Sequence, residues 1–256
     1  MARIIAIANQ KGGVGKTTTA VNLSACLAVK NKKVLVIDID PQGNTTSGLG
    51  VDKNSISKSI YDTIINEVPI KETLCKTQID GLLLSPSNIN LAGAEVELVS
   101  VISRETRLKD ALEEVSGDFD FIIIDCPPSL GLLTINALTA ANTILVPIQC
   151  EYYALEGLSQ LMNTVKIVQK HLNKTLRVEG VVLTMFDART NLSIQVVEEV
   201  KKYFGNKVYR TIIPRNVRLS EAPSYGLPII LYDSRSKGAE CYMELADEVI
   251  MSSEEI

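Results

Sequence analysis

Several residue types that often carry chemistry are scarce in this sequence. There is no tryptophan, a single histidine, and aromatic residues make up 5% of the 256 residues. The five cysteines lie far apart and form no C-x-x-C pair, which argues against a metal or redox site. No apolar run approaches about 18 residues, so no transmembrane helix is expected, and no signal peptide is recognisable. We therefore expect a cytoplasmic protein with reduced, mostly buried thiols.

Apolar runs typical of strands alternate with helical patterns along the whole chain. We predict strands at 4–8, 34–38, 81–85, 121–125, 143–148, 178–184 and 208–213, and helices at 19–28, 91–100, 104–115, 131–141, 154–170, 192–203, 219–222 and 238–251. Residues 45–75 are more polar and irregular, with short helical pieces around 59–66. This alternation predicts an α/β fold, with a mostly parallel central sheet flanked by helices on both faces. No repeat or linker interrupts it, so residues 1–256 are predicted to form one domain.

A glycine-rich segment joins the first predicted strand to the first predicted helix. It reads Lys11-Gly12-Gly13-Val14-Gly15-Lys16-Thr17-Thr18. Glycines let the backbone turn its N–H groups toward phosphate oxygens, and the helix N-terminus adds partial positive charge. In such a loop Lys16 would reach the outer phosphates and the Thr17 hydroxyl would bind Mg²⁺. The segment therefore predicts a nucleotide-binding P-loop.

Two details of this segment depart from the usual patterns. The first glycine of the ordinary P-loop is replaced by Gln10, and Lys11 is an extra lysine at the head of the loop. The glycines do not have the G-x-G-x-x-G spacing of dinucleotide-binding proteins. The loop therefore favours a nucleoside triphosphate over a dinucleotide as the ligand.

Carboxylates follow two of the predicted buried strands, at the edge where parallel sheets bind ligands. Asp125 ends the strand 121–125 and fits the residue that holds Mg²⁺ through a water molecule in P-loop proteins. Asp40 follows the strand 34–38 and is a candidate to orient or deprotonate the attacking water. Asp38 shares a sheet face with Asp40 and is interpreted as a supporting group. The alternative for each aspartate is a helix cap or turn residue.

Three segments taken together, KGGVGKTT, IDIDPQGN and FIIIDCPPS, resemble the deviant Walker-A ATPases of the ParA/MinD family. EYYALEGLSQL, FDARTN and IPRNVRLSEAPSYG are similar to its chromosomal ParA branch, known as Soj. The resemblance implies an ATP- and Mg²⁺-dependent ATPase. It also implies an ATP-bound sandwich homodimer in which Lys11 crosses to the partner's phosphates, like an arginine finger. A side chain at Gly12 should then obstruct the dimer.

The same resemblance assigns residues at both ends of the nucleotide. Lys11, Lys16 and Asp40 would be catalytic, and Pro214 and Asn216 would contact the adenine end, with Met185 nearby. Hydrolysis would be slow without a ParB-type partner.

Charge is unevenly distributed along the chain. Residues 166–218 carry 11 Lys or Arg against 4 Asp or Glu, a net of +7, although the whole chain has a net charge of −4. The family resemblance places non-specific DNA binding by the dimer at Arg189 and Arg218, which both lie in this window. Arginine suits phosphate contacts because its forked donors stay charged. We expect the dimerisation switch to expose these arginines to DNA and the protein to associate with the nucleoid.

Other functions on the same fold remain as alternatives. A MinD-like membrane ATPase would need a basic amphipathic helix near its C-terminus, whereas residues 248–256 are acidic. No membrane partner is therefore expected. An iron–sulfur relative would need suitably placed cysteines, and a small-molecule enzyme would need a substrate pocket that the sequence does not reveal.

Overall fold

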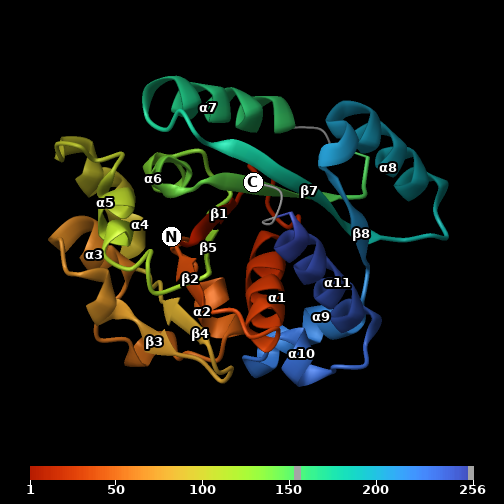
Figure 1. Ribbon diagram of the computed structural model, residues 1–256, viewed down its shortest axis with the longest axis horizontal. Helices are drawn as coiled ribbons and strands as arrows, with labels where there is room; N and C mark the ends of the chain where they lie inside the picture. The colour runs from red at the N-terminus through yellow and green to blue at the C-terminus, as the bar shows by residue number, and fades with distance from the viewer. Residues whose placement is uncertain (153–156, 253–256) are drawn as a thin grey trace.

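The computed structural model describes residues 1–152 and 157–252, arranged in layers around one central sheet (Figure 1). The sheet has eight strands in the order β3-β4-β2-β5-β1-β6-β7-β8. Their bounds are β1 (Arg3–Ile7), β2 (Val34–Asp38), β3 (Cys75–Lys76), β4 (Leu82–Ser85), β5 (Phe121–Asp125), β6 (Thr143–Gln149), β7 (Arg177–Phe186) and β8 (Val208–Pro214). All neighbouring strands are parallel except β3 and β4.

Helices cover both faces of this sheet. The described helices are α1 (Lys16–Val29), α2 (Asn44–Gly48), α3 (Ile60–Asn66), α4 (Leu91–Glu97), α5 (Arg107–Glu113), α6 (Leu132–Ala140), α7 (Leu158–His171), α8 (Asn191–Phe204), α9 (Val217–Glu221), α10 (Ile229–Tyr232) and α11 (Lys237–Met251). Helices α3 to α8 pack on one face, and α1 and α9 to α11 pack on the other. The helix patterns of the sequence thus supply two separate apolar layers.

The central strands are apolar on both sides because both faces of the sheet are covered. Every residue of β2 and of β5 is buried. Successive side chains of a strand point to opposite faces. Accordingly Ile122 and Ile124 join the core under α3 to α8, whereas Ile123 joins the core under α1 and α11.

The parallel register brings the ends of three strands together. Asp125 at the end of β5 lies opposite Ile7 of β1 and opposite Asp38 of β2. The segments that follow these strands therefore meet at one edge of the sheet, where α/β proteins bind their ligands. The phosphate loop, the Asp40 loop and Asp125 lie at this edge.

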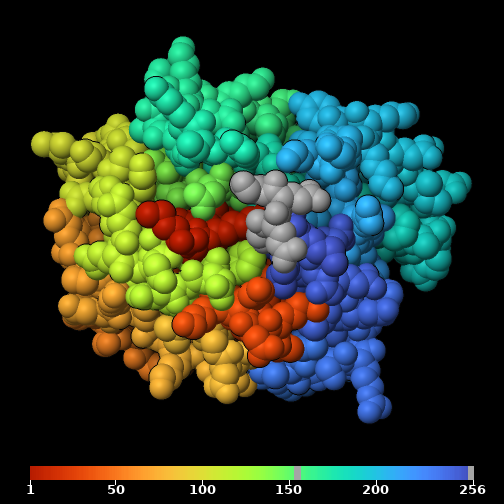
Figure 2. Space-filling model, in the orientation of Figure 1, coloured from red at the N-terminus to blue at the C-terminus, as the bar shows by residue number. Residues whose placement is uncertain are grey.

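The opposite edge of the sheet, where the strands begin, carries the start of the chain, red in Figure 2. A hollow of about 700 Å³ lies there, lined by residues that include Arg3, Asn142 and Arg177. It contains none of the predicted site residues. No helix in the described part of the chain is long and apolar enough to cross a membrane.

The predicted fold class is confirmed, and most predicted elements lie within a few residues of their expected bounds. Among the α-helices and strands, three were missed, one of them the four-residue helix α10. Helix α2 lies partly in the segment expected to be irregular, and the two-residue strand β3 adds an antiparallel edge. Helix α7 begins at Leu158, and its predicted start at Ala154 falls outside the described residues.

Candidate functional site

The glycine-rich segment forms the turn between β1 and α1. Gly13 and Gly15 have φ angles of 74° and 90°, in the left-handed region where side chains are strained. Gly15 is the N-cap residue of α1, and no side chain of the described residues caps that end of the helix. The first-turn N–H groups therefore remain available to an anion, as a phosphate loop requires.

Lys16 is held inside this turn. Its side chain is largely buried, and its Nζ donates a hydrogen bond to the Lys11 carbonyl oxygen at 3.1 Å. Burial lowers the pKa of Lys16, and the nearby Asp125 acts in the opposite direction. A bound phosphate would give this buried ammonium a negatively charged partner and so stabilise its protonated form. By contrast, the Lys11 side chain has no hydrogen bond or ion pair with any described residue.

Asp125 lies beneath the loop and receives hydroxyl hydrogen bonds from two segments. Thr17 Oγ1 and Thr45 Oγ1 both donate to Asp125 Oδ2, at 2.8 and 2.7 Å. Its other oxygen, Oδ1, is buried without a partner among the described residues. Burial raises the pKa of this carboxyl to about 6. Mg²⁺ is bound through oxygens and retained waters, so Thr17 and Asp125 Oδ1 fit a magnesium site.

Asp38 and Asp40 have different surroundings. Asp38 is fully buried, and its carboxylate accepts the N–H and hydroxyl of Thr46 at 2.8 and 2.7 Å and the N–H of Asp40 at 3.2 Å. Burial, with the nearby Asp125 charge, raises the pKa of Asp38 to about 7. Asp40 is 7% exposed, and its Oδ1 accepts the Gln42 N–H at 2.9 Å. Asp38 thus supports the loop, while the second carboxylate oxygen of Asp40 has no hydrogen bond from the described residues and is available for chemistry.

A cavity of about 310 Å³ adjoins the phosphate loop through Gly15 and Thr18. Pro214, Asn216 and Met185 line it, so the structure brings the three residues predicted for the adenine end to the loop. Asn216 is fixed by capping α9, where its Oδ1 accepts the Leu219 N–H. Apolar walls with a few fixed polar groups are typical of small-molecule sites.

Three residues at this edge had no role predicted from the sequence: Thr45, Thr46 and Ser87. All three are fully buried, and their hydroxyl groups bond to Asp125, to Asp38 and to the Asp40 backbone, respectively. The available signal was that Thr45 and Thr46 directly follow the DPQGN loop, and that Ser87 follows β4. Small hydroxyl residues are common in turns, so the pattern alone did not indicate the site.

Comparison with known proteins agrees with this geometry. A profile of the AAA domain family matches residues 2–178. The chain is 66% identical to the sporulation initiation inhibitor protein Soj of Bacillus subtilis (strain 168), covering 97% of this chain and 98% of that protein. It is 56% identical to the chromosome partitioning protein ParA of Myxococcus xanthus, covering 97% and 88%. The chain belongs to the ParA/Soj family of chromosome-partitioning ATPases.

Solved structures with a similar fold agree with this family assignment. A structure described as cobyrinic acid a,c-diamide synthase from Mycobacterium smegmatis, with bound ADP and magnesium, has a TM-score of 0.88 and 40% identity. The match covers 99% of this chain and 96% of that one. The septum site-determining protein MinD of Pyrococcus horikoshii, complexed with Mg-ADP, has a TM-score of 0.81 and 27% identity, covering 97% and 96%. The ParA/Soj fold expected from the motifs is therefore confirmed.

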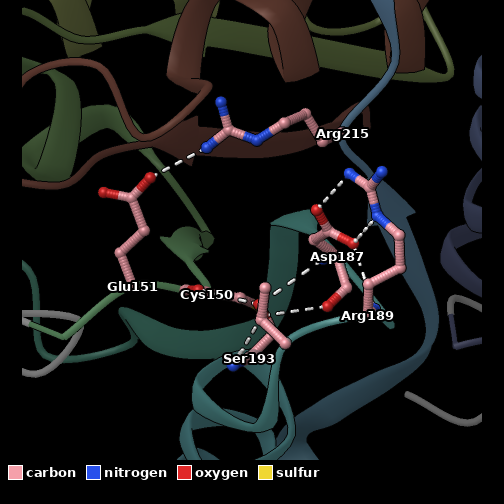
Figure 3. A network of polar contacts seen from close by, with 7 residues as sticks. Cys150, Glu151, Asp187, Arg189, Ser193 and Arg215 are labelled. Carbon is pink, nitrogen blue, oxygen red and sulfur yellow. Dashed lines mark hydrogen bonds and ion pairs between the residues drawn. The ribbon is translucent and has the colours of Figure 1, made fainter.

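The basic window of this ParA/Soj chain contains arginines paired with acidic residues (Figure 3). Arg189 follows β7, and its guanidinium donates two hydrogen bonds to Asp187, at 2.8 and 2.6 Å. These bonds lower the pKa of Asp187 to about 2. Arg215, after β8, pairs with Glu151 at 2.9 Å.

Arg218 lies on α9 and pairs with Glu221 at 3.0 Å and with Asp233 at 3.5 Å. The Arg189 and Arg218 side chains are 86% and 55% exposed in this single chain. No switch is needed to bring these side chains to solvent, and the expectation that dimerisation presents them to DNA stays a prediction. Both arginines already face solvent, and what neutralises them is a neighbouring carboxylate.

Proposed function

We propose that this ParA/Soj chain hydrolyses ATP with Mg²⁺ and uses the cycle to bind and release DNA. The observation that carries the proposal is the meeting of three features at one sheet edge. These are the phosphate loop with its buried Lys16, the Thr17–Asp125 pair with a free carboxylate oxygen, and the adjoining cavity. ADP with magnesium in a solved relative supports the same assignment.

Each residue of the site receives a role in this proposal. The N–H groups from Gly12 to Thr18 and the Lys16 ammonium hold the phosphates, while Thr17 and Asp125, the latter through a water, hold Mg²⁺. Asp40 orients the attacking water and accepts its proton. Mg²⁺ would neutralise charge on the phosphoryl oxygens. We expect Asp40→Ala to bind ATP and dimerise but to hydrolyse it poorly.

The surroundings of Lys11 support the proposed dimer. Its ammonium is not engaged by the described part of its own chain, and its carbonyl holds Lys16, so the side chain can reach outward from the loop. In a two-fold dimer each Lys11 would contact the phosphates bound by the other subunit. A second positive charge would then stabilise the transition state only after the subunits meet.

Such a dimer presents two copies of Arg189 and Arg218 to DNA. A lone chain offers two exposed arginines, each shared with a carboxylate, whereas a dimer offers four on one body. Backbone contacts of this kind are indifferent to sequence and would place the protein on the nucleoid. A ParB-type partner that stimulates hydrolysis would release the dimer.

The MinD-like alternative receives less support. Helix α11 buries most of its apolar side chains against the rest of the protein, although Met251 is exposed. Its charged residues are Glu240, Glu244, Asp247 and Glu248 against a single Lys237. This helix therefore lacks the basic face that attracts anionic lipid.

DNA retention with ADP, ATP and a non-hydrolysable ATP analogue, measured across a salt series, tests the proposal. Four arginine–phosphate contacts predict a slope of log affinity against log salt of about −3.6, or roughly a hundredfold loss between 50 and 200 mM salt. Arg189→Gln should reduce that slope to about −1.8. Equal binding with ADP and ATP, or a slope unchanged by Arg189→Gln, would refute the assignment.

A further inference from the structure

The backbone of Asp40 is held from both sides by buried groups. Its N–H donates to Asp38 Oδ1 at 3.2 Å, and its carbonyl oxygen accepts a hydrogen bond from Ser87 Oγ at 2.7 Å. Asp38 and Ser87 are both fully buried. Because the peptide groups flanking Asp40 are fixed in this way, the direction of its side chain is restricted.

The Thr46 hydroxyl joins the two sides of this arrangement. It donates to Asp38 Oδ2 at 2.7 Å and accepts the Ser87 N–H at 2.9 Å. Asp38, Thr46, Ser87 and Asp40 thus form a closed ring of hydrogen bonds, which we call the Asp40 clamp. The ring joins the end of β2 and helix α2, which follow one another in the chain, to the loop after β4, which lies more than 40 residues further on.

The bonding capacity of each member explains why the ring is rigid. A threonine hydroxyl has one proton, so donation to Asp38 leaves only its lone pairs for the Ser87 N–H. No exposed water competes, because Thr46 and Ser87 are inaccessible to solvent. Losing one partner would leave a buried polar group unpaired.

Helix α2 also connects the clamp to the proposed metal site. Thr45, the neighbour of Thr46, donates to Asp125 Oδ2 at 2.7 Å. The same short helix therefore contacts Asp125 through one residue and the Asp40 clamp through the next. The position of Asp40 relative to the phosphates depends on this helix.

We propose that Thr46 and Ser87 are positioning residues that fix Asp40 for attack of water on the terminal phosphate. This inference rests on the proposed function, in which Asp40 acts on that water. Neither residue touches ATP in this proposal. They act by holding the main chain of Asp40 at both of its peptide groups.

Two substitutions test the clamp, each with a matched control. Ser87→Ala removes the bond to the Asp40 carbonyl, and Ser85→Ala removes an equally buried hydroxyl of the adjoining strand, which bonds Thr73 instead. Thr46→Val removes the central hydroxyl, and Thr46→Ser retains it. Thermal melts identify any variant that fails to fold.

Single-turnover hydrolysis at saturating ATP and DNA measures the chemical step. We expect Ser87→Ala and Thr46→Val to slow it about 10- to 100-fold, the effect of a catalytic group displaced by roughly an ångström. ATP affinity and analogue-induced dimerisation should stay within about threefold, since the phosphate loop is untouched. Ser85→Ala and Thr46→Ser should hydrolyse at nearly the parental rate.

The outcomes separate this inference from the proposed function. If Asp40→Ala hydrolyses ATP normally, the role of Asp40 itself is wrong. If Asp40→Ala is inactive but Ser87→Ala hydrolyses like Ser85→Ala, only the clamp is refuted. A loss of hydrolysis in Ser87→Ala matched by an equal loss of ATP affinity would also refute it, because that result indicates a general structural role.

Discussion

Two neighbouring glycines of the phosphate loop differ in what they would tolerate. A Cβ added to Gly12 or to Gly13 would meet no atom within 4 Å, so neither position is crowded in the single chain. Gly13, however, has a φ of 74°, whereas Gly12 does not lie in the left-handed region. The pair therefore separates the effect of backbone strain from the effect of a side chain on the outer surface of the loop.

The expected magnitudes follow from this difference. Gly12→Val should change the free energy of unfolding by no more than about 0.5 kcal/mol, as for other exposed sites. Gly13→Val forces a β-branched residue into a left-handed conformation, at a cost of about 1–2 kcal/mol that distorts the phosphate loop. A two-fold dimer of the Gly12→Val protein would contain two added side chains. If each overpacks the interface, each weakens the free energy of dimerisation by about 1–3 kcal/mol. Dimer affinity should then fall at least about 30-fold.

Nucleotide binding and light scattering with a non-hydrolysable ATP analogue distinguish these effects. Gly12→Val should bind the analogue almost like the parent protein yet remain monomeric, and Gly13→Val should lose binding itself. Normal dimerisation of Gly12→Val would show that Gly12 lies away from the subunit interface. Loss of nucleotide binding by both variants would contradict the backbone argument.

Further predictions concern the buried lysine, the DNA surface and the site carboxylates. Lys16→Ala should abolish ATP binding in a fluorescent-nucleotide titration, and retained tight binding would disprove its role. Arg189→Glu should lose DNA binding in a low-salt shift assay while ATP-dependent dimerisation persists. Asp187→Asn should instead tighten DNA binding severalfold, because it releases Arg189 from a competing carboxylate; unchanged affinity would count against that competition. Burial raises the pKa values of Asp38 and Asp125 to about 7 and about 6. At a pH between the lower pKa of the unfolded chain and this raised pKa, the folded protein holds more protons, so unfolding releases them. In EDTA without nucleotide, stability in urea melts should therefore fall as pH rises from 5 to 8, and a flat profile would contradict this.

The sequence alone predicted the layered architecture because its strands are short, apolar and regularly separated by helical patterns. It also indicated the phosphate loop, since few requirements other than phosphate binding place glycines and lysine between a strand and a helix in that order. The positions of Asp40 and Asp125 at strand ends placed both at the ligand-binding edge. Roles for Pro214 and Asn216, by contrast, came from family resemblance, because nothing local to IPRN indicates a nucleotide.

Only the tertiary structure showed what surrounds these residues. The pairing of β2 with β4 and β5 brings Thr46, Ser87 and Asp125 around Asp40, although they are up to 85 residues apart in sequence. The sequence could not indicate that one hydroxyl serves Asp38 and Ser87 together. Nor could it show that Arg189 and Arg218 are exposed and paired with Asp187 and Glu221. Local patterns determine which segments are strands and helices, whereas contacts between distant segments depend on strand order and register, which only the folded chain decides.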